Sequence, residues 1–441
     1  MSEVSQALNQ DWDALVASIP DDLEASAKAY GALQRHRGIK SAAALLRLIL
    51  IYANVLSLLT TALWGVGLKL CDISRQALEK RVLGSVAWLE YLLAVLLRSL
   101  LQPPARDTGT LRRIVLRDAS VISRPGSSGI EWRLHLSWDP FKLQPAQVTL
   151  TDVHTGEGLD NAGLQAHDLL LGDRLYGIWR VIRQALEALA YFIIRLTWSN
   201  LPLCTPDGQP LELIAWLKQL PSEQETAERS VYIADDPEKR LMRLVVGRLP
   251  ADKAVAARDK VKATAHEDKR SVNPNTWWAA GFCILLTNLP LSAWSSLDVL
   301  AFYRLRWQIE WCFRRWKSLC HLDVLPAYPA KIAHPVLLAK LIMILLMQQR
   351  LGALPWHELW SKPEPAPVVS PLVAAIYRRV QEIICPPAVI DQLLEDPAPF
   401  WRHLRASHRQ RPLQLAEVAR RFGEHLREVL SASRAPEPAP A

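Results

Sequence analysis

The chain has 441 residues, of which half are hydrophobic and 22% are charged, and 52 Lys and Arg against 44 Asp and Glu give a formal net charge of +8. This balance excludes a disordered chain, and the length suggests about three domains. Six scattered cysteines without a CxxC pair argue against a disulfide scaffold or a thiolate zinc site and suit a reducing cytoplasm. No signal-peptide pattern follows Met1. The basic excess permits a polyanionic partner without identifying one.

The segment 48–67 contains no charged residue over a length that spans a bilayer. In a continuous helix, however, Asn54, Ser57 and Thr61 would lie on one stripe. A polar stripe favours a helix that forms one layer of a soluble bundle. A helical membrane protein, which the apolar segment 335–351 also permits, is the alternative interpretation.

The segment 71–81 lies between two apolar helical patterns. Either Asp72 or Ser74 can serve as the N-cap of a short helix that displays Arg75, Lys80 and Arg81. Such a helix can be an ordinary solvated surface helix, or it can contact a polyanionic partner. The first interpretation is at least as well supported by the sequence as the second. The Pro-Pro pair after Gln102 marks a boundary.

The next part of the chain alternates between strand and helix patterns. Strands are predicted at 112–118, 130–138, 147–153, 169–173 and 191–195, with an Ala- and Leu-rich helix before 169 and another helix at 178–190. Three strands followed by alternating helix and strand predict an α/β domain with a mixed sheet.

From about 200 to 290 the helical pattern fades. Strands are predicted at 228–234, 241–248 and 280–287, and the charged run 252–270 is predicted as a solvated helix or loop. This composition indicates a β-rich insertion. Helices follow at 295–319 and 335–351, then helix with Pro-rich interruptions, an Arg-rich stretch at 402–411 and a tail at 435–441 that we expect to be disordered.

The segment 303–317 carries the most informative side chains. On one continuous helix, one narrow face would present four of them: Tyr303, Arg306, Glu310 and Lys317. The core face would carry the apolar ones: Leu305, Ile309, Cys312, Phe313 and Trp316. A carboxylate between cations suits a metal-binding acid with phosphate contacts on either side. A simple Arg306–Glu310 salt bridge explains the same pattern equally well.

Two further acids, Asp118 and Asp173, end predicted strands and therefore lie at the lip of a sheet, where α/β proteins place ligands. Together with Glu310 they could hold two divalent cations, and hard oxygen ligands favour magnesium or manganese. Such a pair of cations promotes in-line attack on a phosphodiester. Three other acids near strand ends compete for this role: Asp139, Asp152 and Asp168.

The pattern Tyr303-x2-Arg306-x3-Glu310-x6-Lys317 matches the Y-R-E-K signature of bacterial insertion-sequence transposases of the DDE class, the family named for insertion sequence number four. Asp118-Ala-Ser resembles the first acid motif of that family, and Gly172-Asp173-Arg174-x-Tyr176 resembles the second. The segments 286–290 and 74–81 extend the resemblance, which covers residues 70–325.

The resemblance implies an RNase H-like mixed-sheet core with a β-rich insertion, flanked by helical regions at both ends. It implies five regions. Residues 1–108 would be a helical N-terminal part that binds DNA ends, and residues 109–200 would be the first part of the core. The insertion would cover 201–290, the second part of the core with the signature helix 291–352, and a helical C-terminal part with a disordered tail 353–441.

The resemblance also implies the chemistry. Asp118, Asp173 and Glu310 would be catalytic metal ligands for Mg²⁺, with Mn²⁺ as a substitute. Four residues would contact DNA: Tyr303, Arg306, Lys317 and Arg174. The activity would be metal-dependent cleavage and strand transfer at terminal inverted repeats. The partners would be the double-stranded transposon ends and target DNA, bound by a homodimer in the cytoplasm, without a membrane.

Some relatives form a hairpin intermediate in which an aromatic residue of the insertion stacks on a flipped base. Cys283 stands at the expected position, with Phe282, Trp277 and Trp278 as possible substitutes, so the sequence leaves the hairpin step open. A catalytically silent DNA-binding relic is the alternative function, although all three acids are present.

Overall fold

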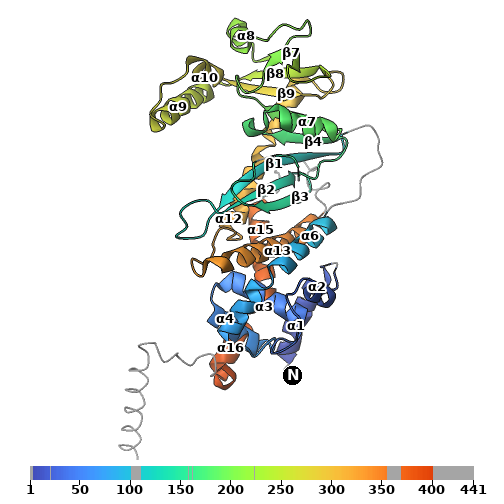
Figure 1. Cartoon of the computed structure of the whole chain (residues 1–441), viewed down its shortest axis with the longest axis vertical. Helices are drawn as coiled ribbons and strands as arrows, with labels where there is room; N and C mark the ends of the chain where they lie inside the picture. Colours follow the sequence, from blue (N-terminus) through green and yellow to red (C-terminus); the bar gives the residue numbers. More distant parts are fainter. Residues whose placement is uncertain are drawn as a thin grey trace, which may run out of the picture.

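The computed structural model describes residues 3–19, 21–100, 111–156, 158–160, 162–222, 224–354 and 369–400. The boundary after Gln102, the Arg-rich stretch 402–411 and the tail 435–441 lie outside these residues. The described chain forms an elongated molecule with a helical base, a central sheet and a second group of strands at the far end (Figure 1).

One nine-stranded mixed sheet forms the body of the molecule, in the order β3-β2-β1-β4-β5-β9-β8-β7-β6. Its strands are β1 Arg113–Ile122, β2 Trp132–Asp139, β3 Gln144–Thr151, β4 Asp168–Gly172, β5 Tyr191–Arg195, β6 Leu203–Cys204, β7 Thr226–Ile233, β8 Met242–Arg248 and β9 Phe282–Thr287. β1, β4 and β5 are parallel, whereas the remaining neighbours are antiparallel. The predicted α/β core with a mixed sheet is confirmed.

Two details of the core differ from the prediction. β1 continues to Ile122, so Asp118 lies within this strand and not at its end. The helix predicted before β4 is absent from the described residues of this connection, which are turns and irregular backbone and include Gly156, Gly158 and Gly163. Gly163 has a φ of +64°, a conformation that a helix cannot contain.

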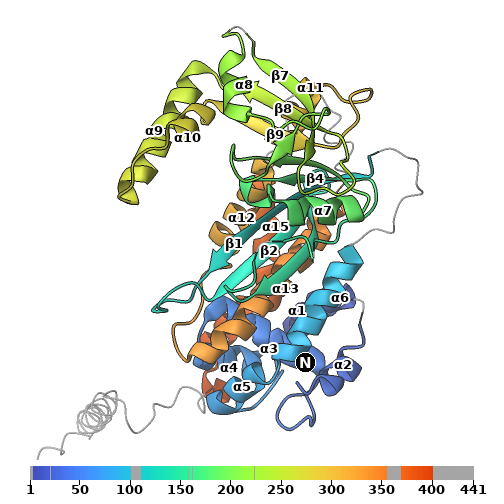
Figure 2. The same ribbon diagram turned by 45° about the horizontal axis from the view of Figure 1, so that its top comes forward.

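The predicted β-rich insertion does not form a sheet of its own. β9 pairs with β5 over Ile193↔Thr287 to Arg195↔Leu285, so the core sheet continues through β9, β8 and β7. The helices of this part are α8 Leu213–Gln219, α9 Ala251–Glu267 and α10 Pro274–Ala279. α9 and α10 form an arm that projects from the sheet (Figure 2).

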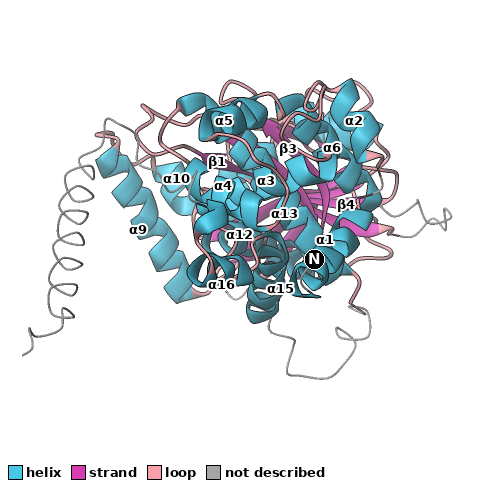
Figure 3. Ribbon diagram, turned by 90° about the horizontal axis from the view of Figure 1, so that it is seen from below, coloured by secondary structure: helices cyan, strands magenta, loops and turns pink. Residues whose placement is uncertain are grey.

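The helical base packs against one face of the sheet around α13 (Figure 3). Its helices are α1 Glu3–Ala17, α2 Leu23–Ala29, α3 Ala42–Val55, α4 Leu58–Gly67, α5 Arg75–Leu83, α6 Val86–Leu100, α13 Ala333–Gly352, α15 Val369–Ile384 and α16 Ala388–Glu395, with the short turns η2 Ala330–Ile332 and η3 Ala398–Phe400. On the other side of the sheet, α7 Trp179–Glu187 follows the turn η1 Arg174–Tyr176.

The segment 48–67 is divided between α3 and α4, so the prediction of one striped helix is wrong. Leu56 adopts a left-handed conformation with a φ of +51° and ends α3, and the Ser57 side chain caps α4 by accepting a hydrogen bond from Thr60 N. One described helix, Ala330–Gly352, is long and apolar enough to cross a membrane, but 83% of its apolar window is buried inside the protein. Such burial is typical of a core helix.

A buried arginine joins the first and last parts of the helical base. Arg47 on α3 is completely buried and donates to the carbonyls of Ile383 and Ile384 at the end of α15, at 2.8 and 3.3 Å. Its guanidinium also lies over the Trp12 ring, 5.1 Å from the centroid. The last carbonyls of a helix have no partner within the helix, so Arg47 satisfies groups that burial would otherwise leave unpaired.

We predict that Arg47→Met lowers the free energy of unfolding by about 3 kcal/mol, because two buried carbonyls lose a charged donor. The exposed Arg98→Met on α6 is the matched control and should change it by less than about 0.5 kcal/mol. Denaturant unfolding followed by circular dichroism measures both variants. Equal stability of the two would show that Arg47 is dispensable.

His135 of β2 is a buried polar residue on the face of the sheet that points away from the helical base. His135 is 3% exposed, and its Nε2 lies 2.9 Å from Thr151 Oγ1. Burial, together with the charges of Arg117 and Arg133, lowers the pKa of His135 to about 4. In the unfolded chain the imidazole takes up a proton below its ordinary pKa of 6.5, whereas in the folded protein it does so only near pH 4. Protonation between these two values therefore favours the unfolded chain.

It follows that the free energy of unfolding should fall as the pH drops from 6.5 toward 4, with about 2 kcal/mol of the loss at pH 4.5 due to His135. His135→Gln keeps a hydrogen-bonding group and should remove this part of the pH dependence. The exposed His154→Gln should retain it. Denaturation curves at pH 7 and 4.5 test the difference, and parallel losses in all three proteins would contradict it.

Candidate active site

The predicted helix 295–319 is two helices, α11 Ser296–Arg304 and α12 Trp307–Ser318. Ser295 begins α11 through a capping box with Asp298. Between the helices the backbone tightens to i→i+3 hydrogen bonds, from Leu305 N to Phe302 O and from Arg306 N to Tyr303 O. The single helical face on which the signature residues were placed is therefore interrupted, with Tyr303 on α11 and Glu310 on α12.

The apolar face of the segment is close to the prediction. Ile309, Cys312, Phe313 and Trp316 are buried, and Leu305 is half-buried. Trp316 meets the buried Trp138 of β2 edge to face, with ring centroids 6.2 Å apart. This packing fixes α12 against the sheet and turns its polar side toward β1.

Asp118 lies on β1, and Asp173 is the residue directly after β4. The parallel register of β1 and β4 runs from Arg113↔Asp168 to Leu116↔Leu171, an offset of 55 residues. Continued by two residues, this offset places Asp118 opposite Asp173, since 118 + 55 = 173. Neighbouring strands lie roughly 4.8 Å apart. Asp173 follows β4 directly and caps η1, where it accepts from Leu175 N at 2.8 Å.

Arg306 connects the sheet to α12. Its guanidinium lies 3.6 Å from Asp118 Oδ2 and donates to Glu310 Oε1. Burial disfavours the Arg306 charge, but the hydrogen bond to Glu310 and the charges of Tyr303, Glu310 and Asp118 raise its pKa overall. The i,i+4 salt bridge considered from the sequence is thus present, and Asp118 from the neighbouring strand joins it.

The donor chemistry of these acids fits a divalent cation, because all three offer hard carboxylate oxygens. As the side chains stand, the described residues contain no group of three His, Cys, Asp or Glu close enough to hold a metal ion. Instead, the Arg306 cation occupies the position between Asp118 and Glu310. A positive charge is therefore already accommodated between two of the three acids.

A buried phenol and two arginines lie beside Asp173. Burial raises the pKa of Tyr303 to about 12, against the effect of the Arg195 and Arg306 charges. The pKa of Arg174 is lowered by loss of solvent around the guanidinium and by the charge of Arg195. Within the described part of the chain, the Tyr303 hydroxyl and Arg195 Nε are buried without a hydrogen-bond partner. Such orphaned donors are costly, and they suit a site that receives an acceptor.

Arg195 was not predicted from the sequence, because its position relative to Asp173 depends on the order of the strands. Arg195 is the last residue of a predicted strand next to the one that leads to Asp173, so the topology brings it to the same edge. Lys317, by contrast, was predicted as a phosphate contact, and its ammonium group donates to the Val121 carbonyl on β1 at 3.0 Å.

The three competing acids all have local structural partners. Asp168 is fully buried and forms a salt bridge with Arg113 at 3.0 Å. Asp139 accepts from the backbone of Phe141 and Lys142, and Asp152 accepts from the backbone of the turn that follows β3. These bonds explain the three acids without a role in chemistry.

The aromatic residues near Cys283 differ in their surroundings. Phe282 lines a cavity of about 150 Å³ together with Arg174 and Trp198. Trp277 and Trp278 instead contact the Arg258 guanidinium, with centroid distances of 4.5 and 5.8 Å. Phe282 is therefore the one of the three candidate substitutes that lines the same cavity as Arg174.

Comparison with known proteins identifies the family of this chain. Residues 109–345, more than half of the chain, match the family model described as the transposase DDE domain. The chain is 33% identical over 351 residues to the transposase for insertion sequence element IS421 of Escherichia coli, covering 77% of this chain and 93% of that protein. The InsL protein of element IS186A from E. coli K12 gives the same identity and coverage over 350 residues. The chain belongs to the DDE transposase family.

More distant matches complete the comparison. The transposase for element IS231F of Bacillus thuringiensis is 26% identical over 290 residues, or 57% of this chain and 60% of that protein. A piggyBac transposase in a synaptic complex with hairpin DNA aligns at a TM-score of 0.39 and 10% identity, covering 80% of this chain and 72% of that one. As a DDE transposase, this protein has the predicted RNase H-like core and depends on divalent metal.

The structural roles of the competing acids lead to a prediction. Asp168→Asn should weaken the bidentate pairing with Arg113 and lower the free energy of unfolding by about 2 kcal/mol. Asp152→Asn, in an exposed turn, should cost about 0.5 kcal/mol. Neither change should alter metal-dependent DNA cleavage by the folded fraction. Loss of cleavage in a stably folded Asp168→Asn protein would place this acid in the active site.

Proposed function

We propose that this transposase cleaves and joins DNA at the terminal inverted repeats of an insertion sequence, with Asp118, Asp173 and Glu310 as its catalytic acids. The observation that carries the proposal is Arg306, whose cation contacts Asp118 on β1 and Glu310 on α12 at once. Asp173 is level with Asp118 by the register of β1 and β4. Asp118 and Glu310, nearly 200 positions apart in the sequence, thus lie close together beside the end of β4.

The three carboxylates would hold Mg²⁺, and Mn²⁺ would substitute for it, since both prefer oxygen ligands. When bound, divalent cations activate the attacking water or 3′-hydroxyl and stabilise the leaving oxygen. Asp118 and Glu310 would exchange the Arg306 cation for metal, which frees the guanidinium to contact a phosphate. Asp173 is held in place by its cap on η1.

The DNA contacts would come from the cationic and phenolic groups around these acids. Arg306 and Arg174 can donate two hydrogen bonds each to a phosphate. The orphaned Tyr303 hydroxyl would gain an acceptor when a phosphate oxygen approaches. Lys317 would add a point charge once its ammonium leaves the Val121 carbonyl.

We also propose a role for each region of the chain. Residues 1–108 would bind the DNA ends, 109–200 and 291–352 would form the catalytic core, 201–290 the insertion, and 353–441 a helical C-terminal region. A homodimer bound to two transposon ends and then to target DNA would act in the cytoplasm, where bacterial DNA lies. Mass photometry with and without end DNA tests the dimer, which should form on DNA.

Glu310→Gln is the central test of the catalytic acids. The substitution preserves shape but removes the charge that holds a cation, so strand cleavage should fall by at least a hundredfold in Mg²⁺ and in Mn²⁺ while DNA binding is nearly unchanged. Asp118→Asn and Asp173→Asn should give similar losses, because the acids act as a unit. The assay uses duplexes that carry the flanking ends of the element.

Glu187→Gln on α7 is the matched control, since Glu187 also pairs with an arginine one turn away. It should cleave at the parent rate. If Glu310→Gln also cleaves at the parent rate in both metals, Glu310 is only the salt-bridge partner of Arg306. If the parent binds end DNA but never cleaves it, the chain is a silent relic.

A further inference from the structure

The two helices of the signature segment are anchored to different parts of the molecule. α12 packs on the core sheet, and the loop that follows it is bonded to the helical base. Tyr377 of α15 donates to the Cys320 carbonyl at 3.0 Å, and Lys340 of α13 donates to the His321 carbonyl at 2.7 Å. Both donors are buried. The core sheet and the base therefore set the position of α12.

α11 instead lies on the strands of the insertion (Figure 2). It packs against β7 and β8, and Val299 of α11 belongs to the same apolar core as Val245 of β8. The approach is close at Gly247 of β8, where a Cβ would lie 2.9 Å from Leu300 Cδ2. The insertion is thus the surface on which α11 rests.

A buried arginine connects this surface to the beginning of α11. Arg243 of β8 is 7% exposed and pairs with Glu228 of β7 through two hydrogen bonds of 2.7 Å. The remaining nitrogen of its guanidinium donates to the carbonyls of Leu289 and Trp294, at 3.1 and 2.8 Å. These carbonyls belong to the loop that joins β9 to α11. Every nitrogen of the Arg243 guanidinium therefore has an acceptor.

Glu228 makes the second half of the connection. Its carboxylate accepts the two Arg243 bonds and a hydrogen bond from the hydroxyl of Ser296, the first residue of α11. The hydrogen bond from Arg243 lowers the pKa of Glu228, so the pair is charged at neutral pH. A bidentate charged pair is geometrically more specific than a single hydrogen bond. We call Glu228, Arg243 and Ser296 the α11 anchor.

The α11 anchor lies about two helical turns before the phenol of the candidate active site. Tyr303 follows Ser296 by seven residues on the same helix, which at about 1.5 Å per residue is about 10 Å. A shift at the beginning of the helix therefore also moves the phenol. α11 and α12 are joined by the i→i+3 turn at 302–306, whose hydrogen bonds have poorer geometry than those of an α-helix. Such a joint lets the two helices change their relative position.

We propose that Glu228 and Arg243 are positioning residues, which set where α11 places the Tyr303 hydroxyl relative to Glu310 on α12. The inference rests on the proposed function, in which both of these groups act in one site. Glu228 and Arg243 act through α11 and not by contact with the substrate. The strands of the insertion then do more than extend the sheet, because they determine the arrangement of the signature segment.

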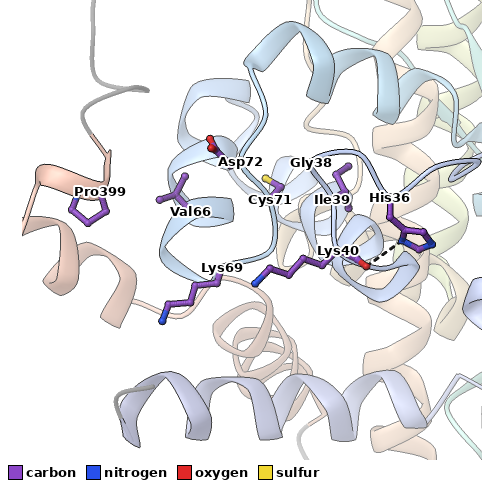
Figure 4. Close-up of a pocket in the computed structure, with 9 residues that line it drawn as sticks. All are labelled: His36, Gly38, Ile39, Lys40, Val66, Lys69, Cys71, Asp72 and Pro399. Atoms are coloured by element: carbon purple, nitrogen blue, oxygen red, sulfur yellow. Dashed lines mark hydrogen bonds between the residues drawn. The ribbon is translucent and has the colours of Figure 1, made fainter.

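The α11 anchor is remote from the region to which we assign the DNA ends. That region, 1–108, belongs to the helical base at the opposite end of the molecule (Figure 1). It contributes most of the residues that line a hollow of about 550 Å³, with Lys40 and Lys69 at its edge (Figure 4). A change in the anchor should therefore leave end binding nearly unchanged and slow the cleavage step.

The test is single-turnover cleavage of end duplexes at saturating protein. Glu228→Gln preserves shape but turns an amide donor toward the Arg243 guanidinium, which has no acceptor to offer. Cleavage by the folded variant should slow by about tenfold or more, since a misplacement of about 1 Å can cost about a hundredfold. The Kd for the duplex should stay within about twofold of the parent value. Ser296→Ala removes one hydrogen bond and retains the Ser295 cap, so it should fold and show a smaller loss.

Asp168→Asn is the matched control, because Asp168 also forms a buried bidentate pair with an arginine, Arg113. It should lower the stability of the protein and leave the cleavage rate of the folded fraction unchanged. Circular dichroism establishes the folded fraction of each variant.

Fluorine NMR reports the position of Tyr303 without any cleavage. Fluorotyrosine incorporated in place of tyrosine gives a resonance for this residue, identified as the one that Tyr303→Phe removes. The resonance should shift in Glu228→Gln and in Ser296→Ala, and it should keep the parent position in Asp168→Asn. An unshifted resonance in both anchor variants would overturn the proposal, and so would parent-rate cleavage by folded Glu228→Gln.

Failure of this proposal is distinguishable from failure of the proposed function. If the anchor variants cleave at the parent rate while Glu310→Gln abolishes cleavage, only the positioning role is wrong. If the parent protein never cleaves end duplexes but its Tyr303 resonance shifts in the anchor variants alone, the proposed function is wrong and the positioning of Tyr303 by the anchor is supported.

Discussion

The proposed active site depends on one interaction, the contact of the Arg306 guanidinium with Asp118 and Glu310. Two carboxylates at close range repel each other, and a cation between them removes that repulsion. In the protein alone this cation is an arginine, whereas catalysis in a DDE transposase depends on a divalent metal, which we propose binds the same acids. Arg306 therefore holds Asp118 and Glu310 together in the protein alone. In the proposed mechanism, new contacts with metal and phosphate would offset the cost of releasing it.

The rest of the fold serves to hold this site. Parallel pairing of β1 with β4 sets Asp118 level with Asp173, and packing of Trp316 on Trp138 fixes α12 against the sheet. Arg47 joins the beginning of the helical base to its last described helices. The sheet also continues through β9, so the insertion is a rigid extension of the core that carries the α9–α10 arm.

Much of this architecture was predictable because strand alternation and apolar periodicity are local patterns. The strands of the core, the buried face of α12 and the Ser74 cap all follow from nearest neighbours in the sequence. The breaks at Leu56 and Leu305 were not predictable, since neither site has a proline or glycine and both depend on tertiary packing. Arg195 was missed because its importance lies in strand order, which no local pattern encodes.

The most direct test of the central claim is to locate the metal itself. Fe²⁺ substituted for Mg²⁺ generates hydroxyl radicals with ascorbate and peroxide, which cut the polypeptide beside the bound ion. The account predicts cuts near Asp118, Asp173 and Glu310 in the same molecule, suppressed by excess Mg²⁺ and by Glu310→Gln. Cuts confined to other segments, or cuts that Mg²⁺ does not suppress, would contradict it.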